Sequence, residues 1–145
     1  MPPGPEYVEL RSRSSFSFLE GASNPEDLIA AAAEQGYEAI ALGDRDGVYG
    51  IPRFHQAALN AGVRAIHGAE MTLDAQGEYE SKPRAAREQA PGERGPALLL
   101  LAESSAGWRN LSRLITQSHT GRAKDEASIR WEQLEAKARD LTLIV

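Results

Sequence analysis

The feature of this sequence that most constrains its fold is a repeated unit in which a helix ends at a glycine and an apolar strand follows. The unit occurs as AAAEQGYEAIAL and again as ALNAGVRAIHG. Strands that alternate with helices of this length indicate βαβ units, whose parallel strands are joined by right-handed crossovers. We therefore predict an α/β domain with a mainly parallel sheet.

The boundaries of the first helix are marked by its residue types. Asn24 can cap the helix, Pro25 suits its first position, and Gly36 ends it. A second helix over residues 51–61 ends at Gly62 in the same way. Further helices are predicted at 106–118 and 131–138, and strands at 7–10, 37–42, 63–68, 97–102 and 141–145.

The domain organisation is simple, because one set of elements runs through the chain. We interpret residues 1–145 as a single domain, interrupted at 74–96 by a polar segment rich in charge, glycine and proline that we expect to be an exposed loop. The sequence stops inside an apolar strand, and natural proteins avoid leaving such an edge uncovered. We therefore expect this domain to be the incomplete front portion of a longer protein.

The composition excludes several classes of protein. No apolar run is long enough for a transmembrane helix, and no secretory signal opens the chain. The sequence has no cysteine, which excludes a disulfide framework and thiolate metal ligands and fits a cytoplasmic setting. The net charge of −5 counts against a domain that grips DNA by itself.

Acids and arginines follow three of the predicted strands: Arg11, Arg13, Glu20, Asp44, Arg45, Asp46 and Glu70. Ligands of βα architectures bind beyond the carboxyl ends of the strands, so this layout is typical of a metal or phosphate site. Arg11 and Arg13 are two residues apart and share a face if the backbone is extended, which favours an inward position over a solvated strand end. For Asp46 the Asp-Gly pair favours a turn.

The three histidines lie outside this set of strand ends. His55 is in the middle of a predicted helix, His67 lies within a strand and is expected to point between layers, and His119 ends a helix, where a cation offsets the helix dipole. One histidine without a second ligand at suitable spacing is weak support for a metal site. We therefore interpret all three as structural.

Three stretches resemble the PHP (polymerase and histidinol phosphatase) domain, in the form that begins bacterial family C DNA polymerases, the polymerase III alpha subunits. They are YVELRSRSSFSFLEGASNPEDL, AIALGDRDGVYGIPRFHQAALNAGVRAIHGAEM and ALLLLAESSAGWRNLSRLIT. The first two are most similar to the error-prone, damage-inducible alpha-type polymerase of translesion synthesis. The resemblance implies the N-terminal portion of a distorted (β/α)7 barrel, whose active members hold up to three divalent metals and hydrolyse phosphoesters.

The metal motifs of this family are altered in the present chain. The resemblance places Arg11 and Arg13 at two histidine positions, Glu20 at a position where aspartate is usual, and Arg45 where active members have histidine. Asp44 and Glu70 are kept. A guanidinium has no lone pair for a metal and is always charged.

Our hypothesis is therefore that Arg11, Arg13 and Arg45 neutralise the acids at positions 20, 44 and 70 and replace metals by ion pairs. We expect a vestigial site with no catalytic residue and no cofactor. If a metal is bound, the ligands are Asp44 and Glu70 and the metal is Mn or Zn.

The resemblance implies a structural, non-catalytic segment of an error-prone DNA polymerase, a nucleotidyltransferase that uses Mg²⁺ in DNA replication and DNA repair. Its partners would be the remainder of the polymerase chain, DNA through that protein, and other translesion or replisome proteins, in the cytoplasm and without a membrane. Two alternatives stay open. One is a metal-dependent phosphoesterase in which Asp44, Asp46 and Glu70 bind one metal and Arg11 and Arg13 bind phosphate. The other is a stand-alone phosphate-binding module.

Overall fold

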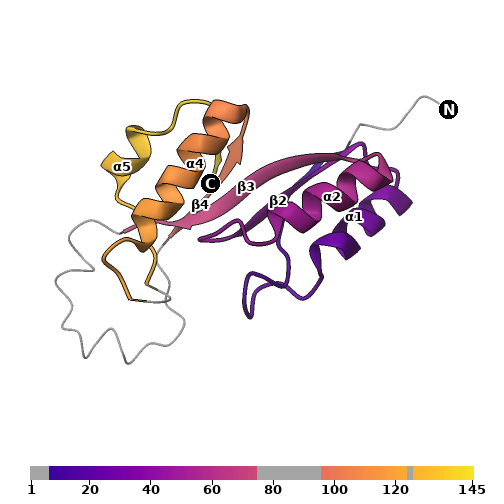
Figure 1. Ribbon diagram of the computed structural model, residues 1–145, viewed down its shortest axis with the longest axis horizontal. Helices are drawn as coiled ribbons and strands as arrows, with labels where there is room; N and C mark the ends of the chain where they lie inside the picture. Colours follow the sequence, from indigo (N-terminus) through magenta and orange to yellow (C-terminus); the bar gives the residue numbers. More distant parts are fainter. Residues whose placement is uncertain (1–6, 75–95, 124–125) are drawn as a thin grey trace.

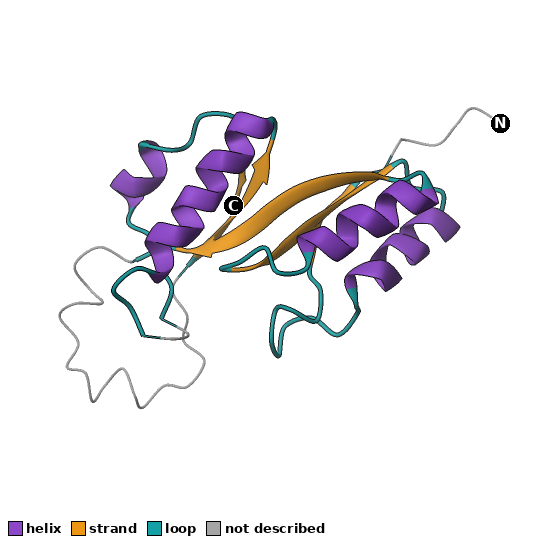
Figure 2. Cartoon of the chain, in the orientation of Figure 1, coloured by secondary structure: helices purple, strands orange, loops and turns teal. Residues whose placement is uncertain are grey.

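The computed structural model describes residues 7–74, 96–123 and 126–145. Its strands form one five-stranded sheet, with helices packed against it (Figure 2). In chain order the elements are β1 (Glu9–Ser12), α1 (Pro25–Glu34), β2 (Ala39–Arg45), α2 (Ile51–Ala61), β3 (Arg64–Thr72), β4 (Ala97–Ala102), α4 (Ser105–His119), α5 (Trp131–Glu135) and β5 (Leu141–Ile144).

The order of strands in the sheet follows the chain, β1-β2-β3-β4-β5. β1 pairs with β2 and β2 with β3 in parallel, whereas β3 pairs with β4 and β4 with β5 in antiparallel fashion. The sheet is therefore mixed, and not mainly parallel as the sequence pattern predicted. The helix–glycine–strand repeat reaches only to β3, and the apolar runs of β4 and β5 carry no sign of strand direction.

The predicted signals at the helix ends are confirmed. The Asp27 carboxylate accepts hydrogen bonds from the main-chain N–H of Asn24 at 3.3 Å and from its side-chain amide at 3.0 Å, which fixes the start of α1. Gly36 and Gly62 have φ of +74° and +71°, a left-handed conformation that strains any residue with a Cβ. Each glycine therefore ends its helix and starts the turn into the next strand.

Figure 1 shows α1 and α2 beside one half of the curved sheet and α4 over the other half. Between β2 and the first two helices lies a core of Ile29, Ala32, Ile40, Leu42, Ile51, Phe54, Ala58 and Val63. Beneath α4 and α5 lies a second core of Ala69, Met71, Leu98, Leu100, Leu111, Leu114, Ile129, Leu134 and Leu141. Val48 and Trp108 pack against both cores and join them.

The alternation of side chains along the strands decides which residues face the helices. Ile40 and Leu42 of β2 belong to a helix-side core, whereas Ala41 packs with Leu99 and Leu101 on the other face of the sheet. The same alternation continues to the carboxyl ends of β2 and β3, where the polar side chains lie.

The predicted exposed loop at 74–96 falls, apart from its first and last residues, outside the described residues. Within the described part of the chain, no helix combines the length and the apolar character that crossing a membrane requires.

Candidate functional site

The polar side chains at the strand ends gather around Glu70, near the end of β3. Its carboxylate is almost buried, with 6% of the side chain exposed, and its Oε2 contacts the Nη2 of Arg13. The other terminal nitrogen of Arg13 donates to Glu20 at 2.8 Å. One guanidinium therefore lies between two carboxylates and joins the loop after β1 to the end of β3.

Arg45 approaches the same carboxylate from β2, which pairs with β3 so that Arg45 and Glu70 are partners in register. Its Nη1 is 3.5 Å from Glu70 Oε2, and its Nε donates to Thr72 Oγ1 at 3.0 Å and is 3.5 Å from Asp46 Oδ2. Only 10% of the Arg45 side chain is exposed. Its charge is thus held by two carboxylates and one hydroxyl, in a geometry set by the strand pairing.

Asp44 lies apart from this ion-pair cluster, because neighbouring residues of a strand point to opposite faces. The Asp44 carboxylate is 2% exposed and accepts three hydrogen bonds of 2.7 Å, from the main-chain N–H and hydroxyl of Ser14 and from the hydroxyl of Ser17. We call this arrangement the serine cage. A Cβ on Gly50 would lie 2.9 Å from Asp44 Oδ2 and 3.1 Å from Ser14 Oγ, so the cage needs a glycine there.

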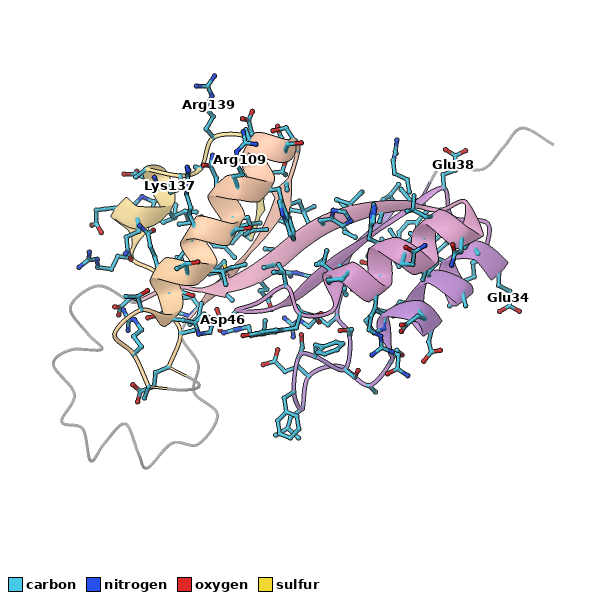
Figure 3. All side chains as sticks on the ribbon, in the orientation of Figure 1. Glu34, Glu38, Asp46, Arg109, Lys137 and Arg139 are labelled. Carbon is cyan, nitrogen blue, oxygen red and sulfur yellow. The ribbon has the colours of Figure 1, made fainter. Side chains whose placement is uncertain are left out.

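Asp46 closes the turn after β2 and has φ of +50°, a left-handed conformation that aspartate tolerates better than most residues. Its carboxylate accepts 2.7 Å hydrogen bonds from the main-chain N–H and the hydroxyl of Thr72. The Nε2 of His119 lies 2.8 Å from the Asp46 carbonyl oxygen, and Figure 3 shows Asp46 next to the end of α4. This turn therefore ties α4 to the carboxyl ends of β2 and β3.

The structure brings some of the predicted residues together and leaves others apart. Arg13, Glu20, Arg45 and Glu70 form the ion-pair cluster, whereas Arg11 is exposed and no side-chain partner for it is seen in the described ranges. β1 ends at Ser12 and its pairing with β2 shifts register between positions 9 and 12, so positions 11 and 13 do not continue one regular strand.

Three residues that complete these contacts were missed by reasoning from the sequence: Ser14, Ser17 and Thr72. Serine is common in loops, so nothing in residue type alone marks it. The available signal was the position of Ser14 and Ser17 in the loop after the first predicted strand, at the same edge of the sheet as Asp44.

The residues present do not fit the set of divalent metals that the resemblance implies. All the hydrogen bonds of Asp44 run to serine donors, and the Oε2 of Glu70 lies against two guanidinium groups. A metal would have to displace Arg13 and Arg45, whose fixed positive charge repels it. Among the described residues, no group of three or more histidine, aspartate or glutamate side chains is arranged to hold an ion.

Comparison with protein families and with curated proteins gives consistent matches. The family profile described as PHP domain matches residues 9–145. An error-prone DNA polymerase of Anaeromyxobacter sp. (strain K) is 40% identical over 94% of this chain, and one of Mycobacterium bovis is 43% identical over 81%. The chain spans only 12% and 11% of the length of these two relatives.

Solved structures show a similar fold at low sequence identity. A protein of Bifidobacterium adolescentis, titled a putative metal-dependent phosphoesterase, aligns with a TM-score of 0.56 and 17% identity over 95% of this chain and 45% of its own. An amidohydrolase of Chromobacterium violaceum, with bound sulfate and no metal, aligns with a TM-score of 0.54 and 22% identity over 79% of this chain and 34% of its own. At these identities the likeness concerns the fold alone.

Proposed function

Because this chain belongs to the PHP domain family, and its curated relatives are error-prone DNA polymerases, we propose that it is the PHP segment of such a polymerase and that its own role is structural. The chain accounts for about an eighth of the relatives' length at most. The remainder of a polymerase chain would then surround it, and the half-open sheet would be part of a distorted (β/α)7 barrel.

In this proposal the parent protein is a nucleotidyltransferase that carries out DNA-directed DNA synthesis, including translesion synthesis in DNA repair. Its polymerase centre would use Mg²⁺ held by carboxylates elsewhere in the longer chain, as in two-metal phosphoryl transfer. The segment would meet DNA and other translesion or replisome proteins through the parent protein, in the cytoplasm. None of these steps would use a residue of the ion-pair cluster.

One observation supports the structural role above all others: the Arg13 guanidinium lies between Glu20 and Glu70, where cations would otherwise balance the acids. A buried carboxylate without a balancing charge destabilises a fold by several kcal/mol. Arg13 and Arg45 supply that charge through fixed side chains instead of exchangeable ions. The ion-pair cluster would then be stable without a metal.

The two alternatives are less well supported by the contacts. A phosphoesterase needs a metal or a general base with free lone pairs, whereas the Asp44 carboxylate accepts hydrogen bonds from serines and Oε2 of Glu70 lies against two arginines. A phosphate-binding module needs an excess of positive charge. Here two arginines, Arg13 and Arg45, lie among three carboxylates at positions 20, 46 and 70, which leaves an excess of one negative charge.

The test is Mn²⁺ binding, measured as the loss of the free-ion EPR signal, together with hydrolysis of bis(p-nitrophenyl) phosphate. Mn²⁺ is suitable because it prefers oxygen ligands. We expect no saturable binding and no hydrolysis by the 145-residue chain. As a positive control, the triple variant Arg11→His, Arg13→His and Arg45→His removes the fixed positive charges from the carboxylates of Glu20 and Glu70, and these oxygen ligands should then gain Mn²⁺ binding.

The opposite result would be a tightly held Mn²⁺ ion in the unaltered chain that disappears in Asp44→Asn or Glu70→Gln. In that case the arginines do not replace a metal, and phosphoesterase activity becomes the leading function. The matched substitution Glu38→Gln changes an exposed acid elsewhere and should leave metal content unchanged in every case.

A further inference from the structure

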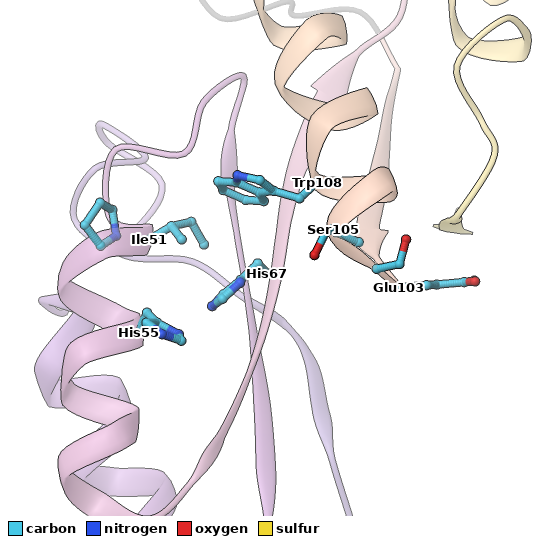
Figure 4. Close-up of a pocket in the computed structure, with 9 residues that line it drawn as sticks. Ile51, His55, His67, Glu103, Ser105 and Trp108 are labelled. Carbon is cyan, nitrogen blue, oxygen red and sulfur yellow. The ribbon is translucent and has the colours of Figure 1, made fainter.

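A hollow of about 420 Å³ lies on the helix side of the sheet, on the opposite face of β3 from Glu70 of the ion-pair cluster. It is lined by Ile51, Pro52, His55, His67, Ala102, Glu103, Ser104, Ser105 and Trp108. Figure 4 shows the His67 ring extending from β3 towards His55 on α2, with Trp108 of α4 above it. Two of the chain's three histidines therefore meet in one open hollow.

His67 has an unusual position for a polar side chain. Its Nε2 is buried and has no hydrogen-bond partner, the only such side-chain atom among the described residues. Buried polar atoms in native proteins are nearly always satisfied by protein, water or an ion. Among the described residues, no group therefore pairs with the lone pair or the proton of this nitrogen.

The neighbours of His67 are aromatic rather than polar. Its ring centroid is 5.0 Å from that of His55 and 5.8 Å from that of Trp108. Burial lowers the pKa of His67, and repulsion from His55 lowers it further. His67 is therefore neutral near pH 7, which is the form of imidazole that binds metals.

The spacing of the two rings suits a shared cation. With a metal–nitrogen bond of about 2.1 Å, the ion lies about 3.2 Å from each ring centroid, and a tetrahedral angle then separates the centroids by about 5.2 Å. The observed separation is 5.0 Å. His55 is exposed, so its ring can turn to bring a nitrogen onto the same point as a nitrogen of His67.

We propose that His55 and His67 form a binding site for a d-block divalent cation such as Cu²⁺, Ni²⁺ or Zn²⁺. Imidazole nitrogen suits these borderline ions and not Mg²⁺ or Mn²⁺. The described residues supply no third imidazole or carboxylate in ligating position, so water fills the remaining positions from the open side of the hollow. Affinity should follow the order Cu²⁺ above Ni²⁺ and Zn²⁺.

This site is independent of the proposed function, because it uses none of the residues of the ion-pair cluster or the serine cage. Its two ligands lie on α2 and β3, so an occupied site would cross-link this helix to this strand. The chain's third histidine, His119, lies at the far end of α4 against Asp46 and provides a natural control.

The experiment is titration of the 145-residue chain with Cu²⁺ and Ni²⁺ in a non-coordinating buffer. Binding is monitored by calorimetry and by tryptophan fluorescence. Trp131→Phe is introduced first, because the chain has two tryptophans and Trp131 is exposed on α5. The remaining indole, Trp108, is then a local reporter beside His67. We expect one ion per chain and quenching of Trp108 that saturates together with the calorimetric signal.

His55→Ala and His67→Phe should each reduce the affinity at least about tenfold, since losing a ligand weakens binding no less than losing an outer hydrogen-bond partner does. His119→Ala should bind as the parent does. The proposal is overturned if no saturable binding occurs below about 1 mM, the weak limit of specific affinity. It is also overturned if His119→Ala has the same effect as the pair variants.

If Glu70→Gln lost metal binding while His55→Ala kept it, the metal would be bound at the ion-pair cluster and not at the histidines. That result would contradict the proposed function as well as this inference. Absence of any metal binding contradicts this inference and leaves the proposed function intact, so the two failures are distinguishable.

Discussion

Replacing Arg13 by methionine tests whether the ion-pair cluster stabilises the fold as the structure indicates. The substitution removes the contact with Glu20, whose side chain is 25% exposed and whose ion pair is worth about 0.5–1 kcal/mol. It also removes the nearer guanidinium from Glu70, which is 6% exposed. Losing a charged hydrogen bond to a buried group costs about 2 kcal/mol when a second charge, here Arg45 at 3.5 Å, remains.

The expected loss is therefore about 3 kcal/mol in the free energy of unfolding, or a drop of about 10 °C in Tm for a chain of this size. Urea unfolding followed by circular dichroism measures it. Arg11→Met is the matched control, because that arginine is exposed two residues earlier and should change stability by less than about 0.5 kcal/mol.

A double-mutant cycle with Glu70→Met separates the ion pair from other effects of the substitution. Removing both charges leaves no buried carboxylate that needs a balancing charge. The loss in free energy of unfolding of the double variant should therefore be about 2 kcal/mol smaller than the sum of the losses of the two single variants. If Arg13→Met is no less stable than Arg11→Met, or if the coupling energy is near zero, the arginine does not neutralise Glu70 and the reasoning above is refuted.

Three further outcomes are expected. Ser17→Ala removes one of the three donors to the buried carboxylate of Asp44 and should lower the free energy of unfolding by about 2 kcal/mol in urea titration. Gly107→Ala places a Cβ 1.9 Å from the main-chain oxygen of Asp140, so α4 must move and thermal unfolding should show a loss of about 2–4 kcal/mol. The pKa of His67 is lowered in the folded chain, so the unfolded chain binds more protons. The free energy of unfolding should therefore fall as the pH drops below about 6.5. Urea titrations at several pH values should show a weaker pH dependence in His67→Phe.

Much of the fold could be predicted from the sequence because local signals are strong where a helix meets a strand. The Asn-Pro-Glu-Asp opening marks the start of α1. The glycines at 36 and 62 end their helices by their own backbone conformation, which is a property of single residues. Strand direction beyond β3 could not be predicted, since LLLL in β4 reads the same in either direction. That choice is made by tertiary pairing.

The contacts among the polar residues at the strand ends could not be read from the sequence. Sequence position alone places Asp44 and Arg45 together at one strand end. Alternation then sends them to opposite faces, so Arg45 reaches Glu70 while Asp44 faces the loop after β1. The partners of Asp44 are serines, whose role depends on the path of that loop and on the small size of Gly50.

The separation of the serine cage from the ion-pair cluster has a consequence for how such a domain can diverge. Ser14 and Asp44 hold the path of the loop on one side of the sheet, while the charges on the other side form a separate unit. The two units meet where the main-chain N–H of Arg45 donates to Ser17 Oγ at 3.0 Å, so only substitutions that disturb this main-chain contact are expected to affect both. The charged side chains of the cluster can therefore be exchanged during evolution while the loop after β1 keeps its path, because the side-chain contacts of Asp44 involve only serines.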